Sequence, residues 1–354
     1  MIVITTPSGL IGHQVLDNLL DSGEELRAIA RDPSALPADV RERLDVVEGS
    51  HGDAAVVDEA FADADTVFWL TPPDPQAASV EAAFVGFTRP AAEAFKRRGV
   101  KRVVGVSALG RGTPWADRAG YVTGSLAMDD LIASSGVGYR ALTNPSFMDN
   151  VVRQAAAINN QGMLFSPIDR DRKLPSVATR DTAAAASRLL LDDSWSGVDE
   201  VPLLGPEDLS FNDMAEIISE ALGKEVRFQQ TTFKAYKDMF VRLGMSDAMA
   251  QAMTDMAWAK NEGLDNAAQR TPENSTPTSF HQWCEEVLKP AVLDQTKAPA
   301  SRGGSAVIDR KTDSTPDKPP PDEVHWQPDP PAGSGKRSPS ASQPRTERSA
   351  VPTT

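Results

Sequence analysis

The stretch Thr5-Thr6-Pro7-Ser8-Gly9-Leu10-Ile11-Gly12 (residues 5–12) follows a β-branched run, Ile2–Thr5, and opens a segment whose apolar residues recur at helical spacing. A strand that turns directly into a helix presents unpaired N–H groups of the first helical turn, which bind negative charge. Gly9 would let the backbone approach a pyrophosphate, and Gly12 would let the helix pack closely on the strand. The pattern predicts dinucleotide binding; the alternative is an ordinary strand-to-helix turn.

This loop supplies the first candidate cofactor-binding residues, which are Thr6, Ser8, Gly9, Leu10, Ile11 and Gly12. Ser8 is placed either to cap the helix or to donate a hydrogen bond to a phosphate. Thr6 stands where the usual motif has its first glycine. The turn must therefore close without the residue that most readily adopts unusual backbone angles.

Around this loop, short β-branched runs alternate with amphipathic segments up to about residue 143, as in parallel strands joined by crossover helices. The first helix is marked by Leu10, Ile11, Val15, Leu16, Leu19 and Leu20, and Ser22-Gly23 ends it. This alternation of strand and helix segments predicts an α/β fold of the Rossmann type with a doubly wound parallel sheet. The expected strands are Ile2–Thr5, Leu26–Ala30, Leu44–Glu48, Thr66–Leu70, Arg102–Ser107 and Tyr139–Thr143.

The end of the second expected strand carries a charge that bears on the choice of cofactor. Arg31 lies 19 positions beyond Gly12 and is followed by Asp32-Pro33. An acid at this place accepts hydrogen bonds from a ribose, whereas an arginine meets a 2′-phosphate. Arg31 thus favours NADP(H) over NAD(H), which stays the alternative cofactor. In the competing interpretation, Arg31 is a solvated charge and Asp32 caps the next helix.

Three further loops follow strands and meet at the same edge of the predicted sheet. In open α/β sheets the carboxyl edge lines the ligand crevice, although each of these loops could simply end a strand. Their candidate cofactor-binding residues are Thr71 and Pro72, Ser107, and Asn144, Pro145 and Phe147.

Beyond residue 150 the pattern continues, and the chain divides into three parts. We expect a dinucleotide-binding core over residues 1–150 and a small α/β substrate or lid region, interleaved with the core, over 151–295. In the second part Val201–Leu204 reads as a strand, and Asn212 to Leu222, followed by Gly223, as a helix. A methionine-rich stripe is interpreted as core or lid packing, with a flexible lid over an apolar substrate as the alternative. It comprises Met239, Phe240, Leu243, Met249, Met253 and Met256.

Residues 296–354 form the third part and have a different composition. They hold 11 of the 27 prolines and nine Lys/Arg against seven Asp/Glu, with very few large apolar side chains. Such a segment buries too little surface to offset its ordering entropy, so we expect a disordered, low-complexity tail. Its alternative role is a partner-binding arm with a polyproline segment at Pro319-Pro320-Pro321.

Charge and composition exclude several classes of function. The net charge of −14 argues against a nucleic-acid partner, because phosphates are bound chiefly by Lys and Arg. The four histidines and the single Cys284 lack metal-ligand spacing, so no metal and no internal disulfide are expected. Without a signal-like start or an 18-residue apolar stretch, we expect a cytoplasmic protein with no membrane partner.

Several stretches resemble the NmrA-like branch of the atypical short-chain dehydrogenases/reductases, over about residues 1–292. The stretches are TTPSGLIG (5–12), LRAIARDPS (26–34), LTNPSFMDN (142–150), SVATRDTAAAASRLLL (176–191), LLGPEDLSFNDMAEIISEALG (203–223) and RTPENSTPTSFHQWCEEVLKP (270–290). The resemblance implies an extended Rossmann fold, a preference for NADP(H) and a small C-terminal substrate region. Members of this group are either reductases of quinones, azo compounds or plant phenolics, or sensors that bind the dinucleotide and regulate partners.

The catalytic pair of the wider superfamily is incomplete. Standard members use Tyr-x-x-x-Lys, where the lysine lowers the pKa of the tyrosine. Here Tyr121 is followed four residues later by Ser125, so Tyr121 is only a weak candidate and the catalytic residues stay unknown. Hydride transfer to a quinone-like or azo-like acceptor does not need the lysine, because the cofactor supplies the chemistry.

Two functional hypotheses follow. The first is an NAD(P)H-dependent oxidoreductase whose small-molecule acceptor lies between Thr71–Asp74, Phe147-Met148 and the C-terminal lid. The alternative is a catalytically silent NADP(H) sensor that binds a protein partner. The sequence leaves the oligomeric state open.

Overall fold

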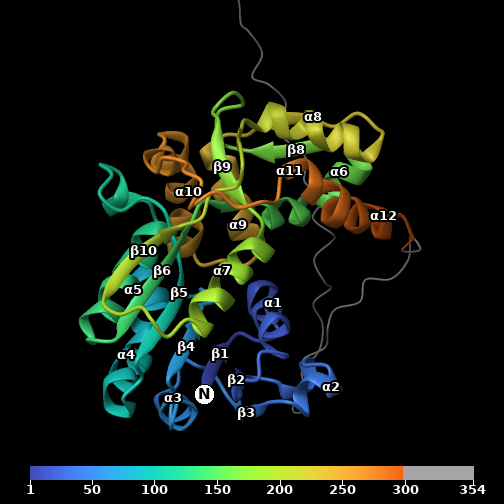
Figure 1. Cartoon of the computed structure of the whole chain (residues 1–354). Helices are drawn as coiled ribbons and strands as arrows, with labels where there is room; N and C mark the ends of the chain where they lie inside the picture. Colours follow the sequence, from blue (N-terminus) through green and yellow to red (C-terminus); the bar gives the residue numbers. More distant parts are fainter. Residues whose placement is uncertain (298–354) are drawn as a thin grey trace, which may run out of the picture. The chain divides into compact units, whose positions relative to one another are not determined.

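We analysed a computed structural model, which describes residues 1–297 (Figure 1). A seven-stranded sheet runs through these residues, in the order β10-β6-β5-β4-β1-β2-β3. Every neighbouring pair of strands in it is parallel. Its strands are β1 (Ile2–Thr5), β2 (Leu26–Ala30), β3 (Asp45–Glu48), β4 (Thr66–Trp69), β5 (Arg102–Ala108), β6 (Gly138–Asn144) and β10 (Val198–Pro202). The predicted Rossmann-type α/β fold is confirmed, whereas the predicted tail, residues 296–354, lies almost wholly outside the described part of the chain.

The expectation of six strands was incomplete. The strand predicted at Val201–Leu204 begins three residues earlier, and it pairs with β6 in the main sheet. Its first three residues, Val198, Asp199 and Glu200, are exposed at the edge of the sheet. An edge strand with polar side chains carries little hydrophobic periodicity, which explains why the sequence pattern missed its position.

Helices cover both faces of the sheet (Figure 1). Alternate residues of each strand contribute to two separate cores, as the period of a strand requires. The β1 side chains Ile2 and Ile4 pack with α1 (Leu10–Leu19) and α7 (Thr179–Leu191). Val3 packs on the other face with α3 (Ala54–Ala60), α4 (Phe87–Arg98) and α5 (Tyr121–Ser134).

Most residues after β6, apart from α7 and β10, build a second region with its own core. Two small sheets occur here: β7 (Ser146–Phe147), β9 (Leu174–Val177) and β11 (Asp208–Leu209) form one, and β8 (Met163–Ser166) and β12 (Arg227–Gln230) form the other. The helices of this region are α6 (Ala155–Gln161), α8 (Phe211–Leu222), α9 (Phe233–Arg242), α10 (Asp247–Asn261), α11 (Phe280–Trp283) and α12 (Lys289–Lys297). The helix predicted from Asn212 to Leu222 is α8, which ends at left-handed Gly223.

The methionine-rich stripe lies on α9, α10 and the turn between them. Met249 is fully buried in the core shared with the sheet, which agrees with the packing interpretation. Leu243, by contrast, is 70% exposed, and no residue of α9 is fully buried. The stripe is therefore core packing in α10 and a half-covered surface in α9.

Candidate functional site

The glycine loop between β1 and α1 is tightly folded. Thr6 has a φ of 51°, in the left-handed region that favours glycine, and the Gly9 N–H donates to the Thr6 carbonyl at 2.9 Å. A Cβ atom on Gly12 would lie 2.0 Å from that same carbonyl oxygen. The close helix–strand packing predicted for Gly12 is confirmed. Thr6 adopts the angles that the missing glycine would have taken.

The N-terminus of α1 is uncapped by any side chain. Gly9 is the N-cap residue, and Ser8, next to it, is exposed. The capping role predicted for Ser8 is therefore wrong, and this residue is exposed at the surface of the loop. Leu10 is 53% exposed, whereas Ile11 is buried in the core beneath the helix. The N–H groups of the first turn, which no intrahelical carbonyl can satisfy, remain for a bound anion.

Two threonines, Thr5 and Thr6, stand where β1 passes into this loop. The Thr5 hydroxyl donates to the Phe68 carbonyl and accepts from the Leu70 N–H, both at 3.0 Å, which ties the end of β1 to the end of β4. The neighbouring Thr6 hydroxyl oxygen is buried but has no hydrogen-bond partner among residues 1–297. A buried hydroxyl without a partner carries a free-energy cost that a bound ligand oxygen would remove.

Arg31, at the end of β2, is exposed and makes no hydrogen bond or ion pair within the described residues. Asp32 accepts from the Ser34 N–H and hydroxyl at 2.9 and 2.6 Å, and these bonds lower its pKa. The expected capping by Asp32 thus occurs on a short 3-10 turn, Pro33–Ala35. Because Asp32 bonds to Ser34 and not to Arg31, the guanidinium of Arg31 is available for a ligand.

A neutral histidine, His51, lies close to Arg31. The ring packs edge-on against Trp69 and Phe87, with centroids 5.1 and 4.8 Å away, and its Nε2 lies 3.0 Å from the Leu70 carbonyl. Burial lowers the pKa of His51 to about 4, and the positive charge of Arg31 adds to this shift. Sequence reasoning did not identify His51 as part of this edge.

The other residues predicted at the carboxyl edge of the sheet differ in how far their side chains are buried. The Thr71 side chain turns into the core, where its hydroxyl accepts from the Trp69 indole at 3.1 Å. The Asn144 amide is buried and fully engaged: it donates to the Ser107 and Leu142 carbonyls and accepts from Thr182. Pro145 and Met148 are also buried, whereas Pro72 is exposed and Phe147 is half-buried. Pro72 and Phe147 are the two of these candidates whose side chains reach the surface.

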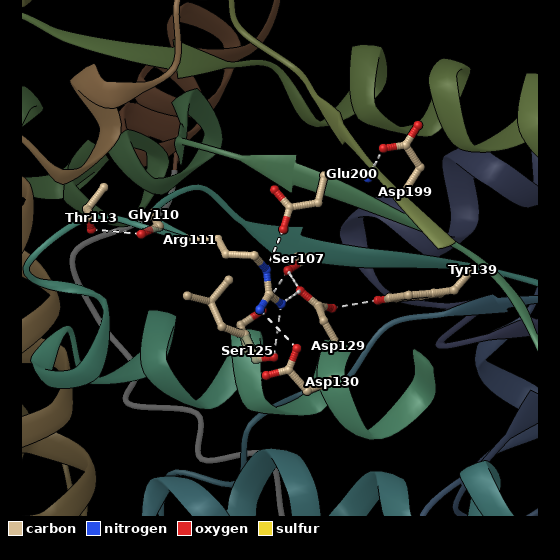
Figure 2. Close-up of polar contacts among 11 residues, drawn as sticks. Ser107, Gly110, Arg111, Thr113, Ser125, Asp129, Asp130, Tyr139, Asp199 and Glu200 are labelled. Atoms are coloured by element: carbon tan, nitrogen blue, oxygen red, sulfur yellow. Dashed lines mark hydrogen bonds and ion pairs between the residues drawn. The ribbon is translucent and has the colours of Figure 1, made fainter. Parts of the chain in front are cut away.

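Ser107 and Ser125 meet beneath this edge, on the face of the sheet covered by α5 (Figure 2). Their hydroxyl oxygens are 3.2 Å apart, and the Ser107 hydroxyl also donates a short hydrogen bond to Asp129. The Tyr139 hydroxyl donates to the other oxygen of the same carboxyl at 2.5 Å. Sequence analysis missed Asp129; its spacing of four residues from Ser125 could have indicated only that both side chains share one face of α5.

Tyr121 has no activating neighbour. Its hydroxyl is buried and lacks a hydrogen-bond partner within residues 1–297, and its ring packs edge-on against Phe84. Burial raises the pKa of Tyr121, an effect larger than the opposing influence of Arg153. A general acid for neutral pH needs the opposite shift, so the structure agrees with the expectation that Ser125 leaves this tyrosine unactivated.

The turn between α9 and α10 is fastened over the loop that follows β4. The Ser246 N–H donates to the Pro75 carbonyl at 2.9 Å, and its hydroxyl donates to the Ala77 carbonyl at 2.7 Å. Gln76 makes a further short bond to the Gly244 carbonyl. This arrangement places α9, α10 and their connecting turn, which together are called the lid below, beside the carboxyl edge of β4.

Two absences apply to the described part of the chain. No group of three or more His, Cys, Asp or Glu side chains is arranged to hold a metal ion. None of the helices has the length and apolar character needed to cross a bilayer.

The parallel sheet, the uncapped helix at its carboxyl edge and the close-packed glycine loop define a Rossmann-type dinucleotide-binding protein. Comparisons with known proteins extend this result. A family model described as NAD(P)H-binding matches residues 8–193, and one described as NmrA-like matches residues 130–295. The chain therefore belongs to the NAD(P)H-binding family, and its later part matches the NmrA-like family, in agreement with the sequence motifs.

The individual proteins described next share at most 30% sequence identity with this chain. An NAD(P)H azoreductase of Xenophilus azovorans is 25% identical over 72% of this chain and 86% of its own. A (4-alkanoyl-5-oxo-2,5-dihydrofuran-3-yl)methyl phosphate reductase of Streptomyces griseus is 30% identical over 65% of this chain and 77% of its own. Among solved structures, an NADPH-dependent quinone oxidoreductase of Escherichia coli aligns with a TM-score of 0.66 at 22% identity, covering 81% of this chain and 99% of its own.

Proposed function

We propose that this protein is an NADP(H)-dependent oxidoreductase that transfers a hydride to a small conjugated acceptor of the quinone or azo class. The observation that carries the proposal is the glycine loop. Gly12 has no space for a Cβ, α1 starts without a side-chain cap, and the buried hydroxyl of Thr6 in the same loop lacks a partner within the described residues. These features fit a pyrophosphate, which needs close backbone approach and several donors.

The residues of the loop and of β2 would divide the binding of the cofactor between them. The first turn of α1 and the Thr6 hydroxyl would hold the pyrophosphate, because both present hydrogen-bond donors without a protein acceptor. Arg31, exposed and unpaired within residues 1–297, would meet the 2′-phosphate that distinguishes NADPH from NADH. Ser8, Gly9 and Gly12 would line the same loop.

The acceptor would lie between the loop after β4, Phe147 and the lid. Pro72 and Phe147 present apolar surfaces from two strand ends, and the half-buried side chains of α9 add Met239 and Phe240. Flat apolar walls with few polar groups suit a conjugated ring. The relatives support this class of substrate, since one is named for azo compounds and one solved structure for quinones.

When bound, the reduced nicotinamide supplies the hydride, so the protein has to position the acceptor and exclude water. The bond from Ser246 to the loop after β4, and the bond from Gln76 of that loop to Gly244, would keep the lid closed during this step. No activated tyrosine is required for hydride transfer itself, which agrees with the raised pKa of Tyr121.

The experiment is steady-state consumption of NADPH and of NADH by the full chain against a panel of quinones and azo dyes. We expect acceptor-dependent oxidation, with kcat/KM for NADPH above that for NADH. Firm NADPH binding with no consumption for any acceptor would contradict the enzymatic proposal and favour a silent sensor that binds a protein partner.

A further inference from the structure

A buried carboxyl, Asp129, lies near Ser125, the residue that stands in place of the superfamily's lysine. It lies on α5, one turn after Ser125, and its side chain is 4% exposed. One carboxylate oxygen accepts from Ser107 and the other from Tyr139, so the group links a buried tyrosine to the hydroxyl at the carboxyl end of β5 (Figure 2).

The absence of a side chain at Gly105 provides the space for the hydrogen bond between Tyr139 and Asp129. Tyr139 lies on β6, fully buried, and its ring crosses toward Gly105 on β5. A Cβ atom at Gly105 would be 2.4 Å from the Tyr139 hydroxyl oxygen. Any larger residue at Gly105 would displace the hydroxyl that donates to Asp129. Since a buried carboxyl without donors is costly, this space explains how the fold tolerates Asp129.

The charged groups around Asp129 come from α5 itself and from two other parts of the fold. Arg111, in the loop after β5, approaches to 3.9 Å and is 40% exposed. It also pairs with Asp130 on α5 at 2.9 Å and with Glu200 on β10 at 2.5 Å. Arg111 therefore divides its charge among three carboxyls and stands between Asp129 and solvent.

We propose that Asp129 stores the proton consumed in acceptor reduction and delivers it through the Ser107 hydroxyl. This inference rests on the proposed oxidoreductase function. Hydride transfer oxidises the reduced nicotinamide and leaves the acceptor as an anion, such as a hydroquinone monoanion. Ser107 gives its hydroxyl proton to that anion and takes the proton from Asp129. The carboxylate that remains accepts from Tyr139, faces Arg111 and regains a proton from water.

The hydrogen bonds support both states of the carboxyl. When Asp129 is ionised, the Ser107 hydroxyl donates to it; when it is protonated, the carboxylic acid donates to Ser107 and frees that hydroxyl to donate elsewhere. Ser125, 3.2 Å away, holds the Ser107 oxygen in place. Burial raises the pKa of Asp129 to about 7 against the lowering effects of Ser107, Tyr139 and Arg111, so both states are populated near neutral pH.

The test compares acceptors that differ in their need for a proton. A naphthoquinone requires a hydride and a proton, whereas a cationic triphenylmethane dye requires only a hydride at its central carbon. Asp129→Asn keeps a group that donates to Ser107 but carries no transferable proton. Asp130→Asn is the matched control, since it removes the neighbouring carboxylate from the same arginine.

For the wild type, quinone kcat should be constant below pH 6 and fall as the pH rises through about 7. Asp129→Asn should lower quinone kcat below pH 6 by about tenfold to a hundredfold, remove the pH dependence and leave dye reduction and NADPH affinity unchanged. Asp130→Asn should keep the wild-type profile. Equal losses for quinone and dye, or an Asp129→Asn profile that still falls near pH 7, would overturn the proposal.

A second readout does not depend on turnover or on the folding of the variant. Infrared spectra of wild type labelled with ¹³C-aspartate should show a protonated carboxyl that disappears between pH 6 and 8, and Asp130→Asn should retain it. Its absence at pH 6 would overturn the proton store whether or not the protein turns over. Absence of NADPH consumption with this carboxyl present would instead contradict the reductase function on which the proton transfer depends.

Discussion

At the scale of single residues, the glycine loop depends on two unusual backbone positions. Thr6 adopts left-handed angles that cost a non-glycine residue on the order of 1 kcal/mol, and Gly12 leaves no space for a side chain. The sequence motif predicted the close packing at Gly12. For Thr6 it showed that the usual glycine is missing, but not which backbone angles the threonine would take. Strain held at a binding loop is consistent with a functional constraint.

Gly12→Ala should disturb this loop, because the added Cβ would meet the Thr6 backbone and cannot be accommodated by a side-chain rotation. We expect the affinities for NADPH and NADH to fall by a similar factor, at least about tenfold. Gly86→Ala is the matched control, since its Cβ would meet its nearest neighbour at 3.8 Å. Fluorescence titration of both cofactors checks the result, and unchanged affinity in Gly12→Ala would place the nucleotide elsewhere.

Arg31→Asp should act on one cofactor far more than on the other. It replaces a free guanidinium by a carboxylate, so a 2′-phosphate loses a charge-assisted contact and gains repulsion. We expect NADPH affinity to fall by about a hundredfold and NADH affinity by less than about threefold. The same titrations, run with Arg41→Ala as a nearby surface control, measure this. Equal losses for both cofactors would show that Arg31 does not contact the 2′-phosphate.

Tyr121→Phe tests whether the tyrosine of the superfamily motif has kept a role. Burial raises its pKa, and no partner among residues 1–297 accepts or donates at its hydroxyl. We therefore expect quinone kcat to change by less than about threefold and stability to be unchanged or slightly increased. A loss of more than tenfold at unchanged NADPH affinity would make Tyr121 a proton donor after all.

At the scale of elements, the lid could be predicted only in outline. Methionines at helical spacing indicated packed helices after residue 230, but the bonds that hold the lid down join Ser246 to residues 169 and 171 positions earlier in the chain. Contacts of that separation leave no periodic signal. β10 was misplaced for a related reason, because an exposed edge strand lacks the alternation that identifies buried strands.

Ser246→Ala should separate the capping role of this serine from its role in the lid. Its hydroxyl caps α10 through the Met249 N–H at 3.2 Å and donates to Ala77. Ser279→Ala is the matched control, since Ser279 caps α11 through the Gln282 N–H alone. Both variants should lose about 1 kcal/mol of unfolding free energy, measured in urea. Only Ser246→Ala should raise KM for the acceptor, and an equal KM in both would contradict the lid.

At the scale of the whole molecule, the sequence was sufficient for the Rossmann-type sheet and insufficient for the chemistry. Parallel strands and crossover helices are local, periodic signals, so β1, β2 and the first helix were predicted within one residue of their observed bounds. The proton-holding network was not predicted, because Ser107, Asp129 and Tyr139 come from three elements that meet only in the folded sheet. None of these three residues stands in a recognisable sequence motif, and what distinguishes them is that their polar side chains are buried together.

The most direct measurement is an anaerobic stopped-flow reaction in which the preformed complex of the full chain with NADPH is mixed with a naphthoquinone. Absorbance at 340 nm follows the cofactor through a single turnover. We expect protein-bound NADPH to be oxidised at least about a hundredfold faster than free NADPH, and more slowly when the transferred hydrogen is deuterium. Oxidation at the rate of free NADPH, for a complex shown by titration to be formed, would contradict the proposal that this protein is an NADP(H)-dependent oxidoreductase.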